Sequence, residues 1–153
     1  GIFFAVAAIG LWTLHLTGVL SYVWPAMQAH IHMTQMVYFF FPFYFFGFLL
    51  TVFPRLMSVP AIRPRTFTLL FLLYFSGAMM FSIGLYAGGI WIQGGVVVAT
   101  LGFVAIAWQM LQVLLRSAYP YKGMPAFMFG GIVFGLIGML VLLHFSWTGS
   151  AVS

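Results

Sequence analysis

Residues 27–60 read MQAHIHMTQMVYFFFPFYFFGFLLTVFPRLMSVP, and this stretch decides the architecture of the chain. Beyond its two histidines, the segment from 36 to 53 is almost entirely apolar or aromatic. A helix needs an apolar run of about 20 residues to cross the hydrocarbon core of a bilayer. The stretch therefore predicts a transmembrane helix over about 29–53. Pro42 removes one backbone donor from this helix and is expected to kink it.

The composition extends this interpretation to the whole chain. Of its 153 residues, 65% are hydrophobic and 3% are charged, whereas a soluble domain carries about 25% charged residues. The apolar runs are continuous rather than alternating, which favours helices over a transmembrane barrel. We therefore predict an all-α, polytopic membrane protein in which residues 1–153 form a single transmembrane helical domain. The five expected spans are about 2–22, 29–53, 67–87, 95–116 and 126–147.

The absence of certain residue types limits the kinds of catalytic and metal-binding site that this chain can form. The sequence contains no Asp, Glu or Cys. Carboxylate acid–base catalysis, a Ser-His-Asp triad and thiolate-bound iron–sulfur clusters are therefore excluded within this chain. The remaining metal-ligand types are His and Met. The net charge of +5 does not indicate a nucleic-acid partner, because the basic residues are few and lie at the ends of the expected helices. Whether the chain is an enzyme stays open.

The positive charges predict an orientation. Arg55, Arg63 and Arg65 lie between the second and third expected spans, and Arg116 and Lys122 lie between the fourth and fifth. All five residues therefore fall on one side of the bilayer, which the positive-inside rule assigns to the cytoplasm. We expect an integral protein of a prokaryotic inner membrane, surrounded by lipid, with its N-terminus cytoplasmic and its C-terminus outside. Because the sequence starts with Gly1 inside an apolar run, we expect a fragment, a processed chain or an incompletely known sequence.

The four histidines cluster in the outer half of this topology. At 1.5 Å rise per residue, His32 and His144 lie about 5–6 Å below the outer boundary, and His15 lies roughly 13 Å deep. Two imidazoles at similar depth on different helices suit the two faces of a six-coordinate haem b. We therefore predict His32 and His144 as axial ligands, with His15 as an alternative ligand. The competing interpretation is that each histidine is hydrogen-bonded to a neighbouring helix for structural reasons.

The fourth histidine, His30, suggests a separate copper site. On a regular helix it shares a face with Met27 and Met33, and it points about 200° away from His32. Thioether and imidazole ligands together suit Cu(I). If the segment before His32 is not helical, His30 and His32 could instead chelate one metal. Methionine is also an ordinary packing residue, which is the alternative interpretation of this set.

Small residues indicate where helices approach one another closely. Gly84 and Gly88 form one GxxxG pattern, and Gly131 and Gly135 form another. Such patterns are typical of close contacts between membrane helices.

Three short motifs carry a family resemblance: AHIHM (29–33), GFLLTVFPRL (47–56) and Pro60. Together they resemble the NnrS family of haem- and copper-containing membrane proteins, which is associated with nitric-oxide metabolism. The resemblance implies that His30 and His32 form the family's H-x-H pair. An acidic residue commonly follows this pair in the family, and here Met33 follows it. Family members are also longer and have more spans, so we expect a truncated relative, one half of a split protein, or a subunit of a larger complex.

Together these observations predict a membrane protein that binds haem b, with copper as a second cofactor. Its expected function is electron transfer or the binding of a diatomic gas such as nitric oxide, and other membrane subunits are its expected partners. The alternative is a non-catalytic accessory subunit of a respiratory or photosynthetic complex, whose histidines are bonded structurally or ligate a pigment. A reduced-minus-oxidised optical spectrum distinguishes the two.

Overall fold

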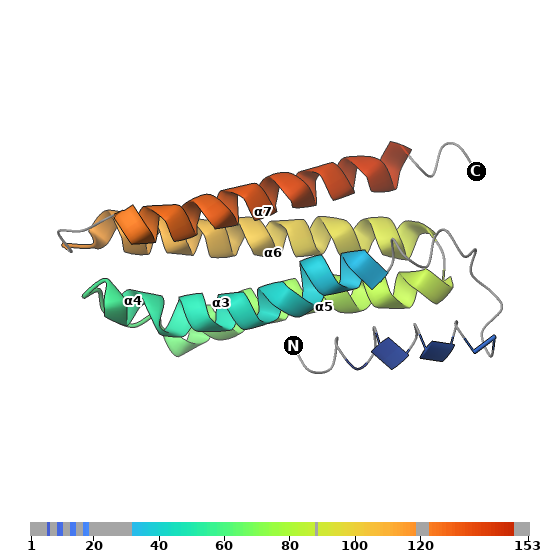
Figure 1. Cartoon of the computed structure of the whole chain (residues 1–153), viewed down its shortest axis with the longest axis horizontal. Helices are drawn as coiled ribbons and strands as arrows, with labels where there is room; N and C mark the ends of the chain where they lie inside the picture. Colours follow the sequence, from blue (N-terminus) through green and yellow to red (C-terminus); the bar gives the residue numbers. More distant parts are fainter. Residues whose placement is uncertain are drawn as a thin grey trace. The chain divides into compact units, whose positions relative to one another are not determined.

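The computed structural model describes residues 6, 9–10, 13–14, 17–18, 32–87, 89–118 and 123–148. Its elements are helical throughout this part of the chain, which confirms the all-α prediction (Figure 1). In chain order they are η1 (Gln35–Phe40), α3 (Phe41–Thr51), α4 (Phe53–Leu56), α5 (Pro64–Ala87), α6 (Gly89–Arg116) and α7 (Gly123–Thr148).

Four helical stretches are long and apolar enough to cross a membrane. They are His32–Thr51, Pro64–Leu85, Gly89–Arg116 and Pro125–Thr148. These stretches correspond to the second, third, fourth and fifth expected spans. The first expected span, 2–22, lies largely outside the described residues.

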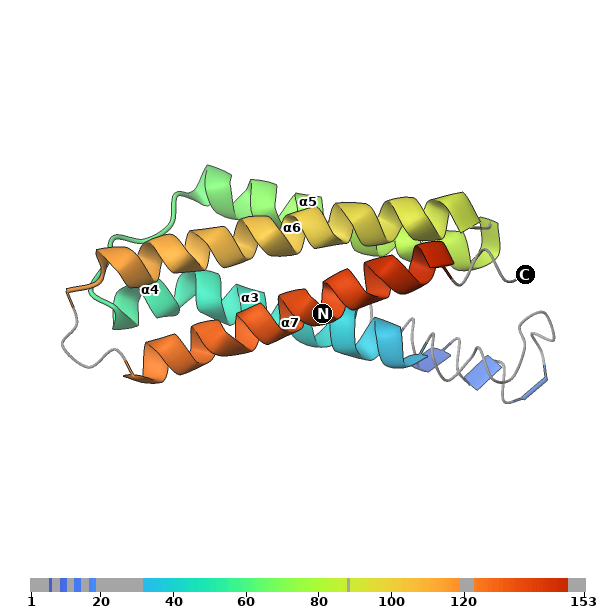
Figure 2. The same cartoon turned by 90° about the horizontal axis from the view of Figure 1, so that it is seen from above.

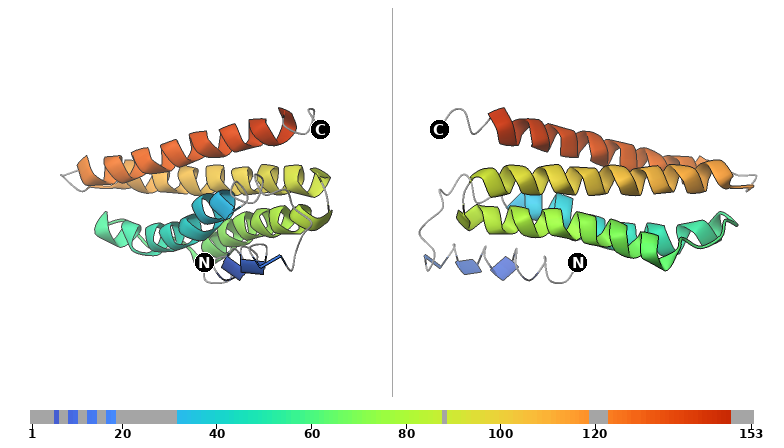
Figure 3. Two further views of the ribbon diagram at one scale, coloured as in Figure 1. Left: turned by 45° about the vertical axis from the view of Figure 1, so that its right-hand side comes forward. Right: turned by 180° about the vertical axis from the view of Figure 1, so that it is seen from behind.

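The chain divides into two compact units, residues 1–48 and 49–153. The single domain expected over residues 1–153 stays a prediction. In the second unit α6 packs against both α5 and α7. Figure 2 shows these three helices side by side, and Figure 3 shows them from two further directions. The start of α5, the end of α6 and the start of α7 share one end of the unit.

The packing of α5 against α6 depends on glycine. A Cβ atom added to Gly102 would lie 2.9 Å from the Cα atom of Tyr74, closer than Cβ contacts in real proteins. Gly77 and Gly95 likewise face the backbone of the opposite helix, at Ala99 and Phe81. Without large side chains between them, the two backbones approach closely and gain dispersion contacts. This interface buries one face of α6, including Val96, Ala99, Phe103 and Ile106.

The two predicted glycine patterns have different outcomes. Gly84 packs against α6 at Ile92, and Gly135 of α7 packs against the ring of Phe103. Among the described residues, a Cβ atom at Gly131 would meet nothing within 4 Å, so this glycine makes no close contact with the helices described. Gly88 lies outside the described residues.

The sequence also placed a loop over about 88–94, but α6 begins at Gly89. Gly94 and Gly95 look like turn residues in the sequence. In the structure Gly95 serves the contact with α5, where the absence of a side chain outweighs its low helix propensity. The contact of Ile92 with Gly84 of α5 lies within the added turns, and the fourth span begins six residues before the predicted 95–116.

The first described span is not a regular α-helix. A π-helix occupies Gln35–Phe40, and the backbone N–H of Phe41 donates to the carbonyl of Met36, five residues earlier. In a regular α-helix the ring of Pro42 would collide with the carbonyl of Tyr38, and its hydrogen bond would be lost. We attribute the wider π turn to this proline, since it removes the collision while α3 continues beyond it. The disruption expected at Pro42 thus takes the form of a π turn immediately before it.

Candidate functional site

His32 is the first described residue of its span. Its Nδ1 atom is buried. Three residues later Gln35 opens the π-helix and is only 2% exposed. A buried amide one helical turn from an imidazole is well placed to bond that imidazole or a ligand held by it. Both residues belong to the first unit.

His144 lies on α7, about 6 Å before the end of that helix, and its side chain is exposed. The neighbouring Phe145 is also exposed, at 70%. An exposed imidazole within an apolar span faces lipid, a partner subunit or a cofactor. Because a polar ring in hydrocarbon is costly, a covering group would stabilise this position.

The surroundings of His144 include a polar contact that the sequence analysis missed. The side-chain amide of Gln93 on α6 donates to the carbonyl oxygen of Ser146 on α7, over 3.4 Å. The signal was present in the sequence, because Gln93 is an isolated amide in an apolar stretch and such groups seek partners on neighbouring helices. The contact joins the two helices beside the last turn that carries His144.

The expected axial pair is divided between the two units. His32 belongs to residues 1–48 and His144 to residues 49–153, so their pairing stays a prediction. The alternative ligand His15 lies outside the described residues.

The expected copper set is described only at Met33, whose side chain is 60% exposed. Met27 and His30 lie outside the described residues. Among the residues that the structure describes, no group of three or more His, Cys, Asp or Glu side chains could hold a metal ion. Methionine sulfur is a further ligand type, and the mixed His–Met set remains a prediction.

The aromatic run that follows His32 exposes some of its rings and buries others. Phe41, Tyr44, Phe45 and Phe48 are exposed, whereas Phe39 and Phe46 are buried. Phe40 packs edge-to-face on Tyr44, with ring centroids 5.2 Å apart. The run therefore presents a broad apolar surface of the kind that lipid or a large planar ligand can cover.

Sequence comparison decides the family. A family model described as NnrS protein matches residues 1–153. The chain belongs to the NnrS family. The match extends from the motifs within 29–60 to the complete sequence. Neither the curated proteins nor the solved structures contain a match to this chain.

The side chains of this NnrS chain can be compared with the cofactors of its family. Imidazole nitrogen is a common axial ligand of haem iron, and His32 and His144 are both imidazoles. Copper(I) accepts thioether and imidazole ligands, which Met33 and the other members of the predicted set supply. The donor types therefore fit both cofactors, although the described spans His32–Thr51 and Pro125–Thr148 contain no Lys or Arg that could meet haem propionates. Trp147 is exposed one turn beyond His144 and offers an indole N–H at that level.

Proposed function

We propose that this NnrS-family chain binds haem b in the outer half of the membrane and uses it for electron transfer or for binding a diatomic gas such as nitric oxide. We further propose copper as a second cofactor. The observation that carries the proposal is the position of His32 and His144 along their helices. Each lies at the end of its span that is remote from the basic residues.

The connectivity supports a common depth for the two histidines. The span from His32 leads after about 30 Å of helix toward Arg55. The span Pro125–Thr148 follows Lys122 and ends just beyond His144. If both helices cross the bilayer, both imidazoles lie on the side opposite to the basic residues. The positive-inside rule makes this the outer side.

The proposed roles follow from the surroundings of each residue. His32 would hold the haem through an imidazole nitrogen, and the buried Gln35, one turn away, would orient that ring. His144 would hold the same group from an exposed face of α7, where coverage would remove the cost of a polar ring in lipid. When bound, haem supplies one-electron chemistry and an iron site for a small gas.

The test is a reduced-minus-oxidised optical spectrum of the protein purified in mild detergent. The wild type is expected to show the Soret and α bands of a b-type haem. His32→Ala is expected to lose most of the haem, because half of the axial ligation is removed. His144→Ala should do the same. Val37→Ala and Phe145→Ala, which truncate exposed neighbours on the same two spans, should retain the wild-type spectrum.

Two outcomes would contradict the proposal in different ways. A featureless wild-type spectrum, recorded on protein isolated with its native partners, would refute haem binding and favour the accessory-subunit function. A normal spectrum in His144→Ala, with loss of haem in His15→Ala, would retain haem binding but refute the His32–His144 pair.

A further inference from the structure

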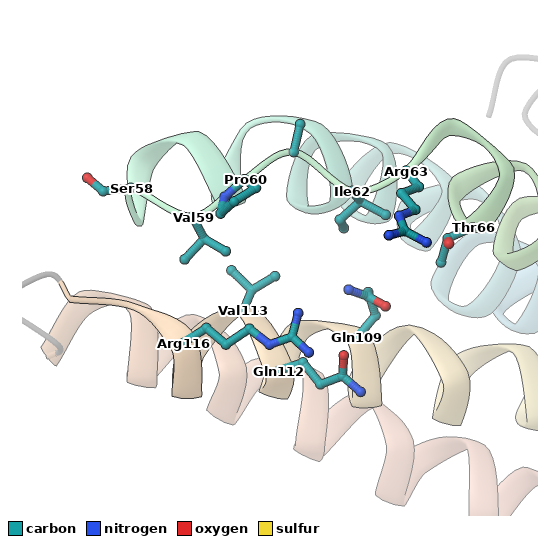
Figure 4. Close-up of a pocket in the computed structure, with 11 residues that line it drawn as sticks. Ser58, Val59, Pro60, Ile62, Arg63, Thr66, Gln109, Gln112, Val113 and Arg116 are labelled. Carbon is teal, nitrogen blue, oxygen red and sulfur yellow. The ribbon is translucent and has the colours of Figure 1, made fainter.

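A polar pocket lies in the second unit, at the end remote from His144. It has a volume of about 580 Å³ and lies between the loop after α4, the first turn of α5 and the last turns of α6. Its polar lining consists of Ser58, Arg63, Thr66, Gln109, Gln112 and Arg116. Figure 4 shows side chains from these two walls facing one another across the space.

The two arginines enter this pocket from opposite walls, one from the loop before α5 and one from α6. Arg63 immediately precedes α5, and Arg116 is the last residue of α6. In Figure 4 the guanidinium groups of both point into the space between the two walls. Gln109, Gln112 and Arg116 are spaced three and four residues apart, so they share one face of α6. The pocket therefore gathers two positive charges and two amides around one volume.

No acidic side chain in the sequence compensates the positive charges of Arg63 and Arg116. The sequence contains no Asp or Glu, so no carboxylate side chain of this chain can pair with Arg63 or Arg116. Two like charges that face the same pocket repel each other, and an anion between them would turn this repulsion into attraction. No acidic side chain within residues 1–153 can therefore supply the counter-charge.

The loop after α4 forms one wall of the pocket, and hydrogen bonds of its own backbone hold it in place. Ser58 and Val59 donate to the carbonyls of Arg55 and Pro54, over 3.1 and 2.9 Å, and so close the end of α4. The buried Ser117 donates from its hydroxyl to the carbonyl of Met57 over 3.1 Å, which ties this loop to the end of α6. The two walls are therefore fixed relative to each other before a ligand arrives.

We propose that this pocket binds a phosphate group, and that the phosphate belongs to the headgroup of an anionic lipid. Guanidinium groups match phosphate with paired hydrogen bonds, and amide and hydroxyl donors complete its coordination. The pocket is much larger than one phosphate ion, which leaves room for the rest of a headgroup. Its position at the ends of two spans is the level at which headgroups lie, and basic pockets between helices at this level are suited to them.

The experiment measures lipid retention by native mass spectrometry on the full chain purified in dodecyl maltoside. The probes are phosphatidylglycerol and phosphatidylcholine, each titrated from mixed micelles. The wild type is expected to bind one phosphatidylglycerol and to bind phosphatidylcholine at least about tenfold more weakly, because the choline group offsets the phosphate charge.

Two double variants distinguish lipid binding in the pocket from general electrostatic attraction to the basic end of the protein. Arg63→Gln with Arg116→Gln removes both pocket charges, and phosphatidylglycerol should bind at least about tenfold more weakly. Arg55→Gln with Arg65→Gln removes the same net charge at residues that do not line the pocket, and binding should change by less than about threefold. Arg63→Lys with Arg116→Lys keeps the charge but loses the planar fork, so intermediate binding is expected. Circular dichroism and gel filtration confirm that each variant is folded.

A second arm identifies the source of the phosphate. Millimolar inorganic phosphate should displace little lipid if the headgroup is the ligand. Complete displacement, with the same dependence on Arg63 and Arg116, would support the phosphate site but assign it to a soluble phosphate. Equal losses in the two glutamine double variants would overturn the proposal, because attraction would then be spread over the basic end. Binding of a glutamate-rich peptide in place of phosphatidylglycerol would also overturn it and would indicate a protein partner.

Discussion

At the scale of single residues, Ser58 has a backbone conformation that glycine would adopt more easily. It has a positive φ of 55° and occupies the left-handed position that closes α4. This conformation costs a residue with a side chain about 1–2 kcal/mol. Ser58→Gly should therefore raise the free energy of unfolding by roughly 1 kcal/mol, measured by thermal unfolding in detergent.

The control for this substitution is Ser76→Gly. Ser76 lies exposed inside α5, where glycine is the poorer helix former. We expect this variant to be destabilised by roughly 0.5 kcal/mol. Stabilisation by both substitutions, or by neither, would show that the conformation at residue 58 does not limit stability.

Met33 allows a test of the proposed copper site at the one member of its set that the structure describes. Met33→Leu conserves volume but removes the sulfur ligand. Copper content, measured by mass spectrometry of the metal after purification, should fall by at least half while the haem spectrum is retained. Met128→Leu on α7 is the matched control and should keep its copper. Unchanged copper in Met33→Leu would exclude this residue as a ligand.

Residue identities could be predicted from the sequence more readily than residue environments. The sequence singled out His32, His144 and Met33 because their side chains are the available metal-ligand types. It could not show that His144 and Met33 are exposed, since exposure depends on which neighbouring helix covers each face. The left-handed Ser58 was also unforeseen, because glycine is the usual residue at such a position.

At the scale of elements, the contact between α5 and α6 should be the most sensitive to added volume. Gly102→Leu would place a side chain against the backbone of Tyr74. Overpacking of this kind costs about 1–3 kcal/mol or separates the helices. Gly130→Leu on α7 adds the same side chain where a Cβ atom meets nothing within 4 Å.

We expect Gly102→Leu to unfold at a clearly lower temperature than the wild type in the same detergent. Gly130→Leu should unfold within a few degrees of the wild type, because its side chain enters open space. Equal destabilisation by the two leucines would indicate a general intolerance of bulk rather than a close contact at Gly102.

The continuous hydrophobicity of the sequence predicted that the described spans exist. Where they begin and how regular they are depends on contacts with neighbouring residues. The start of α6 at Gly89 and the π turn before Pro42 both depend on local packing and hydrogen bonding. Glycine occurs both in loops, where it ends a helix, and at close contacts within helices, and composition alone does not distinguish the two. Proline likewise signals a disruption without specifying its form.

At the scale of the whole molecule, the expected orientation can be tested with single cysteines. The sequence contains no cysteine, so each introduced thiol is the only one in the chain. In intact cells, a membrane-impermeant maleimide should label Thr148→Cys, at the end of α7. Ala61→Cys, in the loop before α5, should be labelled only after permeabilisation. The reverse pattern would place the basic residues outside and refute the predicted topology.

The family could be inferred from motifs over a fifth of the chain, and the match over residues 1–153 now places the whole sequence in it. Sequence motifs could not show which histidines lie close enough to bind the same cofactor. Periodicity and charge give each helix a direction and a depth, but they do not determine which helices are neighbours. Which helices are neighbours depends on the contacts between their side chains, and the faces of these helices are too uniformly hydrophobic for the sequence to reveal those contacts.

The uncompensated charges at the basic end have an electrical consequence. In a cell whose interior is negative, moving one positive charge outward across the membrane costs about 2.3 kcal/mol per 100 mV. Turning the chain over would move all five of its basic residues, and no acidic residue would move with them. The electrical work would be roughly 11 kcal/mol at 100 mV, comparable to the whole folding free energy of a typical domain. In the orientation proposed here, the resting potential of the cell would itself hold the protein in place.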